Sequence, residues 1–224
     1  TIRTLLLLLF VAGIAAAFLG GAPASAALIV CAAQNCGTTT ENLLFNTGVQ
    51  TATTVFGTTN AGTAVTVMGT NTLVAQGGQS SVTGTSGVLT GGLNFFLTNG
   101  GSFTAFEFNL EGVPGNPPPV EATTVTFTIT GANGVLTTTS PYPIYALAGN
   151  GNNWFSGYTT GGDVITDIAF TLNPTGAAVD SLKQVRLGGV SVVPEPATWS
   201  MMILGFGLIG VTARRRRRTL PAFS

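Results

Sequence analysis

Apolar and polar residues alternate along several short stretches between residues 27 and 193. The clearest stretch is 124–130, where Val, Phe and Ile alternate with four threonines. A period of two places alternate side chains on opposite faces of a β-strand, so this stretch predicts a strand with one buried and one solvated face. The stretches 106–110 and 168–172 show the same alternation, which predicts that Glu107 and Asn109 face solvent.

Other strand candidates are weaker, and glycine, asparagine and proline supply turns between them. They lie at residues 43–45, 49–56, 63–68, 81–89, 92–97, 142–148 and 183–193, the last with a break at Gly188-Gly189. No part of the body has a helical period of helical length. Nine or ten short strands joined by closely spaced turns predict an all-β body, an antiparallel two-sheet sandwich of jelly-roll type. Most of the 14 phenylalanines are expected in its core, the alternative being an exposed sugar-stacking platform.

The proline run at 117–119 is the most obvious internal break. Consecutive prolines cannot join a sheet interior, so we expect a surface loop there in preference to a linker between half-domains. The chain is therefore divided into residues 1–26, a body at 27–193, a signal at 194–218 and a tail at 219–224.

The N-terminal segment 1–26 has the three parts of a secretory signal. A basic start at Arg3 precedes an apolar stretch at 5–19, and small residues follow at Ala24 and Ala26. We expect an N-terminal signal helix that signal peptidase removes by cleavage after Ala26. The apolar stretch is too short to cross a bilayer comfortably.

A second uncharged apolar run occupies residues 199–213 and predicts a short transmembrane helix. Arginines are costly inside a bilayer, so a basic cluster directly after the run stops transfer and stays on the cytoplasmic side. The cluster consists of Arg214, Arg215, Arg216, Arg217 and Arg218. The body is then expected on the other side of the membrane, in agreement with the N-terminal signal.

Pro194-Glu195-Pro196 stands before this run, followed by Trp199 and then by the apolar helix and the arginines. The arrangement resembles the PEP-CTERM sorting signal of exported Gram-negative surface proteins. It is similar to the PEPxxWA subtype, with Ser200 where that subtype commonly has Ala. The resemblance is limited to this C-terminal segment. It implies recognition of the tripeptide by an exosortase, a membrane-embedded cysteine transpeptidase, and implies nothing about the body.

Charge is sparse and unevenly placed. The whole chain has eight basic and eight acidic side chains, and it has no histidine. The body contains two basic residues, Lys183 and Arg186, against seven acids, a net charge of −5. We therefore expect no nucleic-acid partner for the body, because phosphate binding needs clustered basic residues.

Cys31 and Cys36 are the only cysteines, and they lie just after the expected cleavage site. In an exported chain such a pair predicts a disulfide that closes a small loop at the mature N-terminus. A zinc site is disfavoured, because two thiols without histidine supply too few ligands.

The absence of histidine excludes Ser-His-Asp and Cys-His catalysis. Glu107 and Glu111 share one strand face, which leaves a two-carboxylate glycosidase as an alternative. Their alternation with apolar residues favours a solvated strand face, so we expect no catalytic site.

A polar stretch at 150–158 is interpreted as a loop near two acids. Carboxylate and amide oxygens suit calcium, and a tryptophan beside them suits sugar stacking. Ordinary turn residues are the preferred interpretation, and no cofactor or metal is assigned. The candidate glycan or calcium residues are Asn150, Asn152, Asn153, Trp154, Asp163 and Asp167.

The sequence thus predicts an exported, non-catalytic protein of the cell surface or extracellular matrix, with a structural or interaction role. It would pass the inner membrane during sorting and then reach the envelope surface or the medium. The expected partners are signal peptidase, exosortase, the membrane through the C-terminal helix, and exopolysaccharide. A carbohydrate-binding module, with calcium as a candidate ligand, is the alternative function, and a glycosidase is a weaker one.

Overall fold

The structure is a computed structural model, and it describes residues 27–78, 80–113, 120–136, 144–149, 151–193 and 200–209. Several predicted features lie outside these ranges. They are the signal peptide with Ala24 and Ala26, the proline run, Asn150, the motif residues Pro194, Glu195, Pro196 and Trp199, and the five arginines 214–218.

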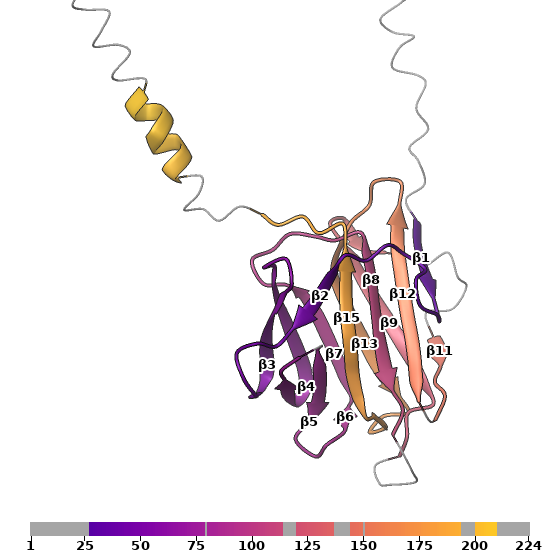
Figure 1. The fold of residues 1–224 in the computed structure, drawn as a ribbon. Coiled ribbons are helices and arrows are strands. Elements are labelled where there is room, and N and C mark those ends of the chain that lie inside the picture. The colour runs from indigo at the N-terminus through magenta and orange to yellow at the C-terminus, as the bar shows by residue number, and fades with distance from the viewer. Residues whose placement is uncertain are drawn as a thin grey trace, which may run out of the picture.

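Within the described ranges the body consists of strands joined by turns (Figure 1). The strands are β1 (Ala27–Cys31), β2 (Glu41–Leu44), β3 (Gln50–Thr59), β4 (Ala64–Gln76), β5 (Ser81–Gly84), β6 (Leu89–Thr90), β7 (Gly92–Leu97), β8 (Ala105–Glu111), β9 (Thr124–Gly131), β10 (Gly134–Val135), β11 (Ile144–Ala146), β12 (Asn152–Thr160), β13 (Ile165–Asn173), β14 (Ala178–Val179) and β15 (Ser181–Gly188). The predicted all-β, antiparallel body is confirmed: every ladder between these strands is antiparallel.

Thirteen of the strands belong to one hydrogen-bonded sheet. Its order is β1-β12-β8-β15-β2-β3-β4-β7-β13-β9-β10, with β11 on β9 and with β5 bonded to both β15 and β4. The remaining two strands, β14 and β6, form a small sheet of their own.

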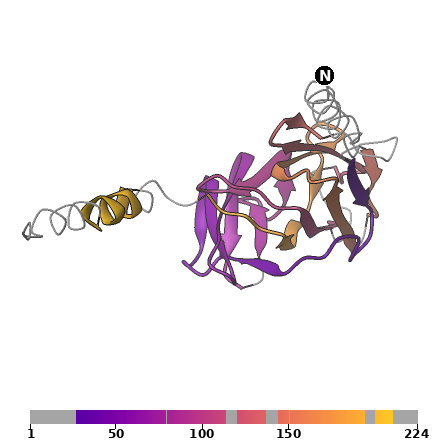
Figure 2. The ribbon, with the colours of Figure 1, turned by 90° about the horizontal axis from the view of Figure 1, so that it is seen from above.

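The long sheet folds over, so that its two halves face each other as layers (Figures 1 and 2). Strands β1, β12, β8 and β15 form one layer, and β4, β7, β13 and β9 form the other. The prediction of two separate sheets is corrected here. Strand β2 bonds to β15 and β3, and β5 bonds to β15 and β4, so hydrogen bonds join the layers along one side.

Phe108 of β8 lies at the centre of the core between the layers. It is fully buried. Its ring centroid lies 5.7 to 6.1 Å from five other rings, those of Phe95, Phe106, Phe127, Phe155 and Phe170. Three of these partners come from the opposite layer, on β7, β9 and β13. The cluster therefore holds the two layers together, as expected for most of the phenylalanines.

Most predicted strands are present, and the stretches 106–110, 124–130 and 168–172 lie in β8, β9 and β13. The predicted break is also found, since β15 ends at Gly188. Four strands escaped prediction: β1, β12 and the two-residue strands β10 and β14. The stretch 150–158 was expected to be a loop, but Asn152–Thr160 is a nine-residue strand between β1 and β8. Its polar residues pair within the sheet because both neighbours offer backbone partners.

Residues 200–209 form a helix with exposed side chains. Within the described ranges, no helix has both the length and the apolar character needed to cross a bilayer. The predicted C-terminal transmembrane helix is thus not supported by the structure, and part of its span, residues 199 and 210–213, lies outside the described residues.

Replacing the central ring tests the role of the aromatic cluster. Phe108→Ala is expected to lower the free energy of unfolding by about 3–5 kcal/mol, because it leaves a cavity where five rings met. Phe56→Ala, at a side chain that is 53% exposed, should cost less than about 1 kcal/mol. Urea denaturation measures both values. Equal losses in the two variants would contradict a core centred on Phe108.

Candidate functional site

Strands β12, β8 and β15 carry three rows of polar and aromatic side chains on the face directed away from the core. Inward positions such as Phe108 and Phe155 alternate with outward ones, and the antiparallel register sets the outward residues side by side. We call this surface the outer face. Its rows are Ser156–Glu107–Arg186, Trp154–Asn109–Lys183 and Asn152–Glu111–Ser181.

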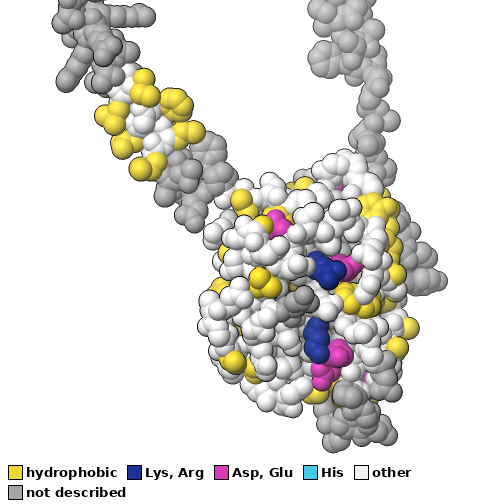
Figure 3. Space-filling model, viewed as in Figure 1, with side chains coloured by type: hydrophobic (Ala, Val, Ile, Leu, Met, Phe, Trp, Pro, Cys, Tyr) yellow, Lys and Arg dark blue, Asp and Glu magenta, His cyan; other side chains and the backbone are white. Residues whose placement is uncertain are grey.

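A bulge in β15 brings both basic residues of the body onto this face. Lys183 pairs with Asn109 and Arg186 with Glu107, so three steps on β15 match two on β8. Gln184, between them, has a positive φ of 54°. In a regular strand, residues three positions apart point to opposite faces. The extra residue of the bulge places Lys183 and Arg186 on the same face. Figure 3 shows both basic side chains on one side of the molecule, each beside acidic ones.

Glu107 is buried on the outer face, with 1% of its surface exposed. Arg186 Nη1 donates to its Oε1 over 2.8 Å, and the backbone N–H of Asn35 donates to its Oε2 over 2.7 Å. The prediction that Glu107 and Asn109 face solvent is therefore wrong. The alternation correctly indicated the shared face, but the segment 32–40 covers this end of β8.

The covering segment is fixed to the sheet by a disulfide and by hydrogen bonds. Cys31 and Cys36 form the expected disulfide, with Cα atoms 6.1 Å apart. The N–H of Cys36 donates to Ser156 Oγ over 3.0 Å, and that hydroxyl donates to the carbonyl of Ala33 over 2.6 Å. The loop is thus held directly above the row that contains Glu107.

In the middle row a half-buried tryptophan lies beside a buried amide. Asn109 is 2% exposed, and its Nδ2 donates to Asn152 Oδ1 over 2.5 Å. Within the described part of the chain, Asn109 Oδ1 is buried without a hydrogen-bond partner. Buried polar atoms are nearly always paired, with protein, water or ligand. The Asn109 amide pairs with Trp154 in register and, like Glu107, is buried where the sequence predicted exposure to solvent.

In the lower row Glu111 pairs with the Lys183 ammonium and accepts from Ser181 Oγ over 3.2 Å. The hydrogen bond from Lys183 holds the pKa of Glu111 below its ordinary value, against the opposing effect of burial. Each of the two carboxylates considered for a glycosidase is therefore engaged by a basic side chain.

Of the six residues proposed for glycan or calcium, the five that the structure describes do not form one site. Asn152 and Trp154 begin β12, whereas Asp163 follows its far end and Asp167 lies in β13. Nine strand residues span about 26 Å at the usual rise, so the two groups lie far apart. Asn153 is used internally, with its Oδ1 accepting from Ala148 N over 2.6 Å. The described residues hold no group of three acidic, cysteine or histidine side chains suited to a metal.

Asp167 instead lies on the outer surface of the opposite layer. Its Oδ2 accepts from Asn94 Nδ2 over 2.9 Å. Partial burial raises the pKa of Asp167 above its ordinary value of 3.8, and the hydrogen bond only partly offsets this effect.

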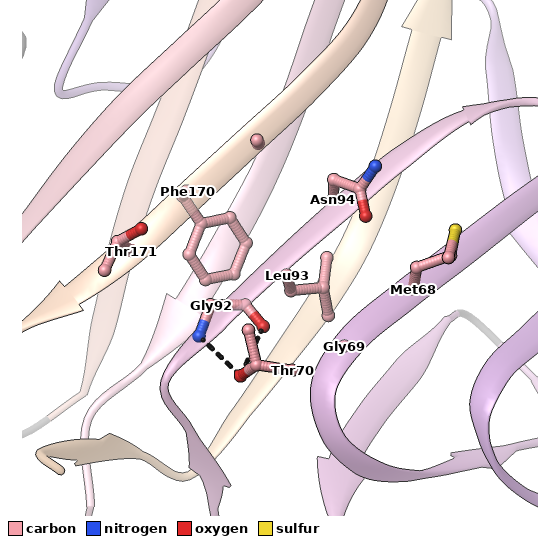
Figure 4. Close-up of a pocket in the computed structure, with 9 residues that line it drawn as sticks. Met68, Gly69, Thr70, Gly92, Leu93, Asn94, Phe170 and Thr171 are labelled. Atoms are coloured by element: carbon pink, nitrogen blue, oxygen red, sulfur yellow. Dashed lines mark hydrogen bonds between the residues drawn. The ribbon is translucent and has the colours of Figure 1, made fainter.

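A hollow of about 290 Å³ lies on the same layer, between β4, β7 and β13 (Figure 4). Met68, Leu93 and Phe170 make it largely apolar. Thr70 Oγ1 is occupied at its rim, where it accepts from Gly92 N over 3.1 Å and donates to Gly92 O over 3.3 Å. This hollow offers no charged side chain to a ligand.

Comparison with protein families identifies the C-terminal segment. Residues 192–218 match the family described as the PEP-CTERM protein-sorting motif. The chain carries a PEP-CTERM sorting signal. This signal implies processing by an exosortase and indicates export to the cell envelope or surface. The match covers the expected tripeptide, apolar run and arginines, and leaves the body unassigned.

Comparison with curated proteins gave no match. Among solved structures, the chain is similar to CBM35 from Paenibacillus barcinonensis, with 12% identity over 71% of this chain and 100% of that one. The TM-score of 0.22 is too low to carry an argument about fold or ligand.

The raised pKa of Asp167 predicts a pH-dependent effect of Asp167→Asn. Because the folded-state pKa lies above the unfolded value, the charged carboxylate destabilises the fold once the pH exceeds both values. The variant should therefore be more stable than the parent protein at about pH 7, and this gain should vanish below about pH 3. Urea denaturation at both pH values measures the difference. Asp163→Asn removes one negative charge from the adjoining turn, and an equal gain there would assign the effect to net charge alone.

Proposed function

We propose that this is a surface protein of the cell envelope or extracellular matrix, whose body has a structural or interaction role without catalysis. The sorting-motif match at residues 192–218 carries the proposal. The earlier steps belong to it as well: signal peptidase cleaves after Ala26, the apolar C-terminal run holds the chain in the inner membrane, and exosortase then acts. The basic N-terminus and the arginine cluster support this order.

The positions of both expected cuts support a body that remains folded after processing. Strand β1 begins at Ala27, which pairs with Thr160 directly after the proposed signal peptidase site. At the other end Ser191 exchanges two backbone hydrogen bonds with Ser102, at 2.8 and 2.7 Å, three residues before Pro194. Neither cut removes a strand of the sheet, so the body is delivered intact.

The chemistry of the acidic residues supports a non-catalytic role. General acid catalysis by a glycosidase needs one free carboxyl group and a second carboxylate across the substrate. Both oxygens of Glu107 accept hydrogen bonds, and Glu111 is paired with Lys183. The chain also has no histidine that could act as a general acid or base in place of these carboxylates.

Changing the sorting tripeptide tests the main proposal. Pro194→Ala with Glu195→Ala should abolish C-terminal processing, because an enzyme that reads the tripeptide loses its contacts. Mass spectrometry of the protein recovered from the exporting cells shows both termini. Val193→Ala, at an exposed neighbour outside the tripeptide, should be processed normally. Normal processing of the double variant would refute the exosortase step.

A second function is favoured by one observation on the outer face. Trp154 is half-buried beside Asn109 Oδ1, which has no hydrogen-bond partner among the described residues, and amide, ammonium and carboxylate groups flank the two side chains. An aromatic face with adjacent hydrogen-bonding groups suits a sugar ring, which has apolar faces and hydroxyl edges. We propose a carbohydrate-binding module there, on a sandwich of jelly-roll type. From β7 the chain passes to β8 and then to β9, β12, β13 and β15, and each of these strands lies in the other layer from the one before it. This alternation between layers supports that topology.

This second function predicts that Trp154→Ala weakens glycan binding by at least about tenfold, through loss of the stacking surface. A glycan array probed with the parent protein and the variant measures the change. Phe56→Ala removes an exposed aromatic ring from β3, outside the outer face, and should leave binding unchanged. Binding that survives in Trp154→Ala would exclude the outer face as the glycan site.

A further inference from the structure

A polar cavity of about 400 Å³ lies beside Arg186, above the first row of the outer face. Pockets that hold small ligands begin at about 300 Å³. The lining comes from the segment before β2, from β2 and from β15, and includes Asn35, Thr38, Thr39, Thr40, Asn42 and Arg186. Unlike the hollow between β4 and β7, this cavity is lined by amides, hydroxyls and a guanidinium.

Arg186 brings unused hydrogen-bond donors to the cavity. A guanidinium has five N–H groups in a rigid fork. Within the described residues its hydrogen bond to a side chain is the one from Nη1 to Glu107. The Arg186 side chain is 36% exposed, so it is accessible from solvent. Its remaining N–H groups are available to acceptor oxygens of a ligand.

The wall of the cavity is held in place before any ligand arrives. The N–H of Asn35 is bonded to Glu107, and that of Thr40 donates to the carbonyl of Leu187 over 2.9 Å. The Cys31–Cys36 disulfide closes the loop that leads into this segment. A preformed site loses less conformational entropy on binding than a mobile loop does.

The charges around the cavity favour an uncharged ligand. Among the described residues that line the cavity, Arg186 is the charged one, and Glu107 pairs with it. The pair has no net charge, so the carboxylate of an acidic sugar would compete with Glu107 for the guanidinium, whereas a neutral sugar needs only the hydrogen-bonding groups.

Arg186, which lines the cavity, lies in the row of the outer face next to the row that contains Trp154. Arg186 pairs with Glu107, and Lys183 pairs with Asn109, next to Trp154. The rows are two residues apart on β8, about 7 Å, and β15 and β12 lie on either side of β8, about 10 Å apart across the sheet. Different units of one oligosaccharide can therefore reach Arg186 and Trp154.

We propose that the cavity beside Arg186 is a subsite for one uncharged sugar unit of a glycan, another unit of which stacks on Trp154. This inference rests on the proposed glycan-binding function and names the class of glycan. Arg186 donates to ring or hydroxyl oxygens, the threonine and asparagine side chains bind further hydroxyls, and Glu107 cancels the charge of the guanidinium.

The test uses the mature protein recovered from the exporting host, with immobilised neutral hexose oligosaccharides and oligouronates as probes. The parent protein should bind a neutral oligomer in preference to the uronates, with little change between about 0.05 and 0.5 M salt. Arg186→Lys keeps the positive charge but loses the fork, and should weaken binding about tenfold. Thr40→Tyr replaces an exposed side chain and fills the cavity. It should weaken glycan binding at least as much as Arg186→Lys does. Thr58→Tyr makes the same change at an exposed threonine of β3 and should have no effect.

The outcomes separate the two proposals. Parent-like binding in both Arg186→Lys and Thr40→Tyr, with loss in Trp154→Ala, would overturn the subsite and leave glycan binding standing. Tighter, salt-sensitive binding of oligouronates would overturn the assignment of an uncharged sugar. No binding by the parent protein to any probe would refute the glycan function itself, and the subsite with it. Urea denaturation of each variant verifies that it is folded, and Thr40→Tyr tests the cavity without replacing either residue of the ion pair.

Discussion

Burial of the Glu107 carboxylate constrains the whole outer side of the body. A charged carboxylate out of contact with water is costly unless a cation and hydrogen-bond donors compensate it. Here Arg186 supplies the cation and the Asn35 N–H supplies a donor, so β15 and the segment 32–40 must both approach β8. The bulge at Gln184, the disulfide loop and the cavity beside Arg186 are all consistent with this one requirement.

Strand β8 also organises the opposite side of its own layer. Phe108 points inward from the position next to Glu107 and meets rings from both layers, so apolar packing and buried charge lie back to back on one strand. Such a strand has little freedom to shift its register, because a slip of one residue would exchange the two faces. The rigid placement of β8 in turn fixes Asn109 between Trp154 and Lys183.

The architecture separates transport from recognition. The sorting signal lies beyond the last backbone pairing of the body at Ser191, while the candidate binding groups lie on a sheet face built from central strands. All residues of the rows on the outer face and of the cavity lining lie within the body, between residues 27 and 193. A protein built in this way can be delivered by a general sorting route and still carry its own specificity.

The sequence alone was enough to predict the all-β class, most strands, the aromatic core and the sorting signal, because each depends on local patterning or on a contiguous motif. It placed Glu107 and Asn109 in solvent, since a period of two tells which residues share a face and does not tell whether another segment covers that face. It also predicted a loop at 150–158, because the polar character of Asn152 and Asn153 hides strand pairing. Only the tertiary structure decided these points: hydrogen bonds between residues 70 or more positions apart bury Glu107, and cross-strand register sets Trp154, Asn109 and Lys183 in one row.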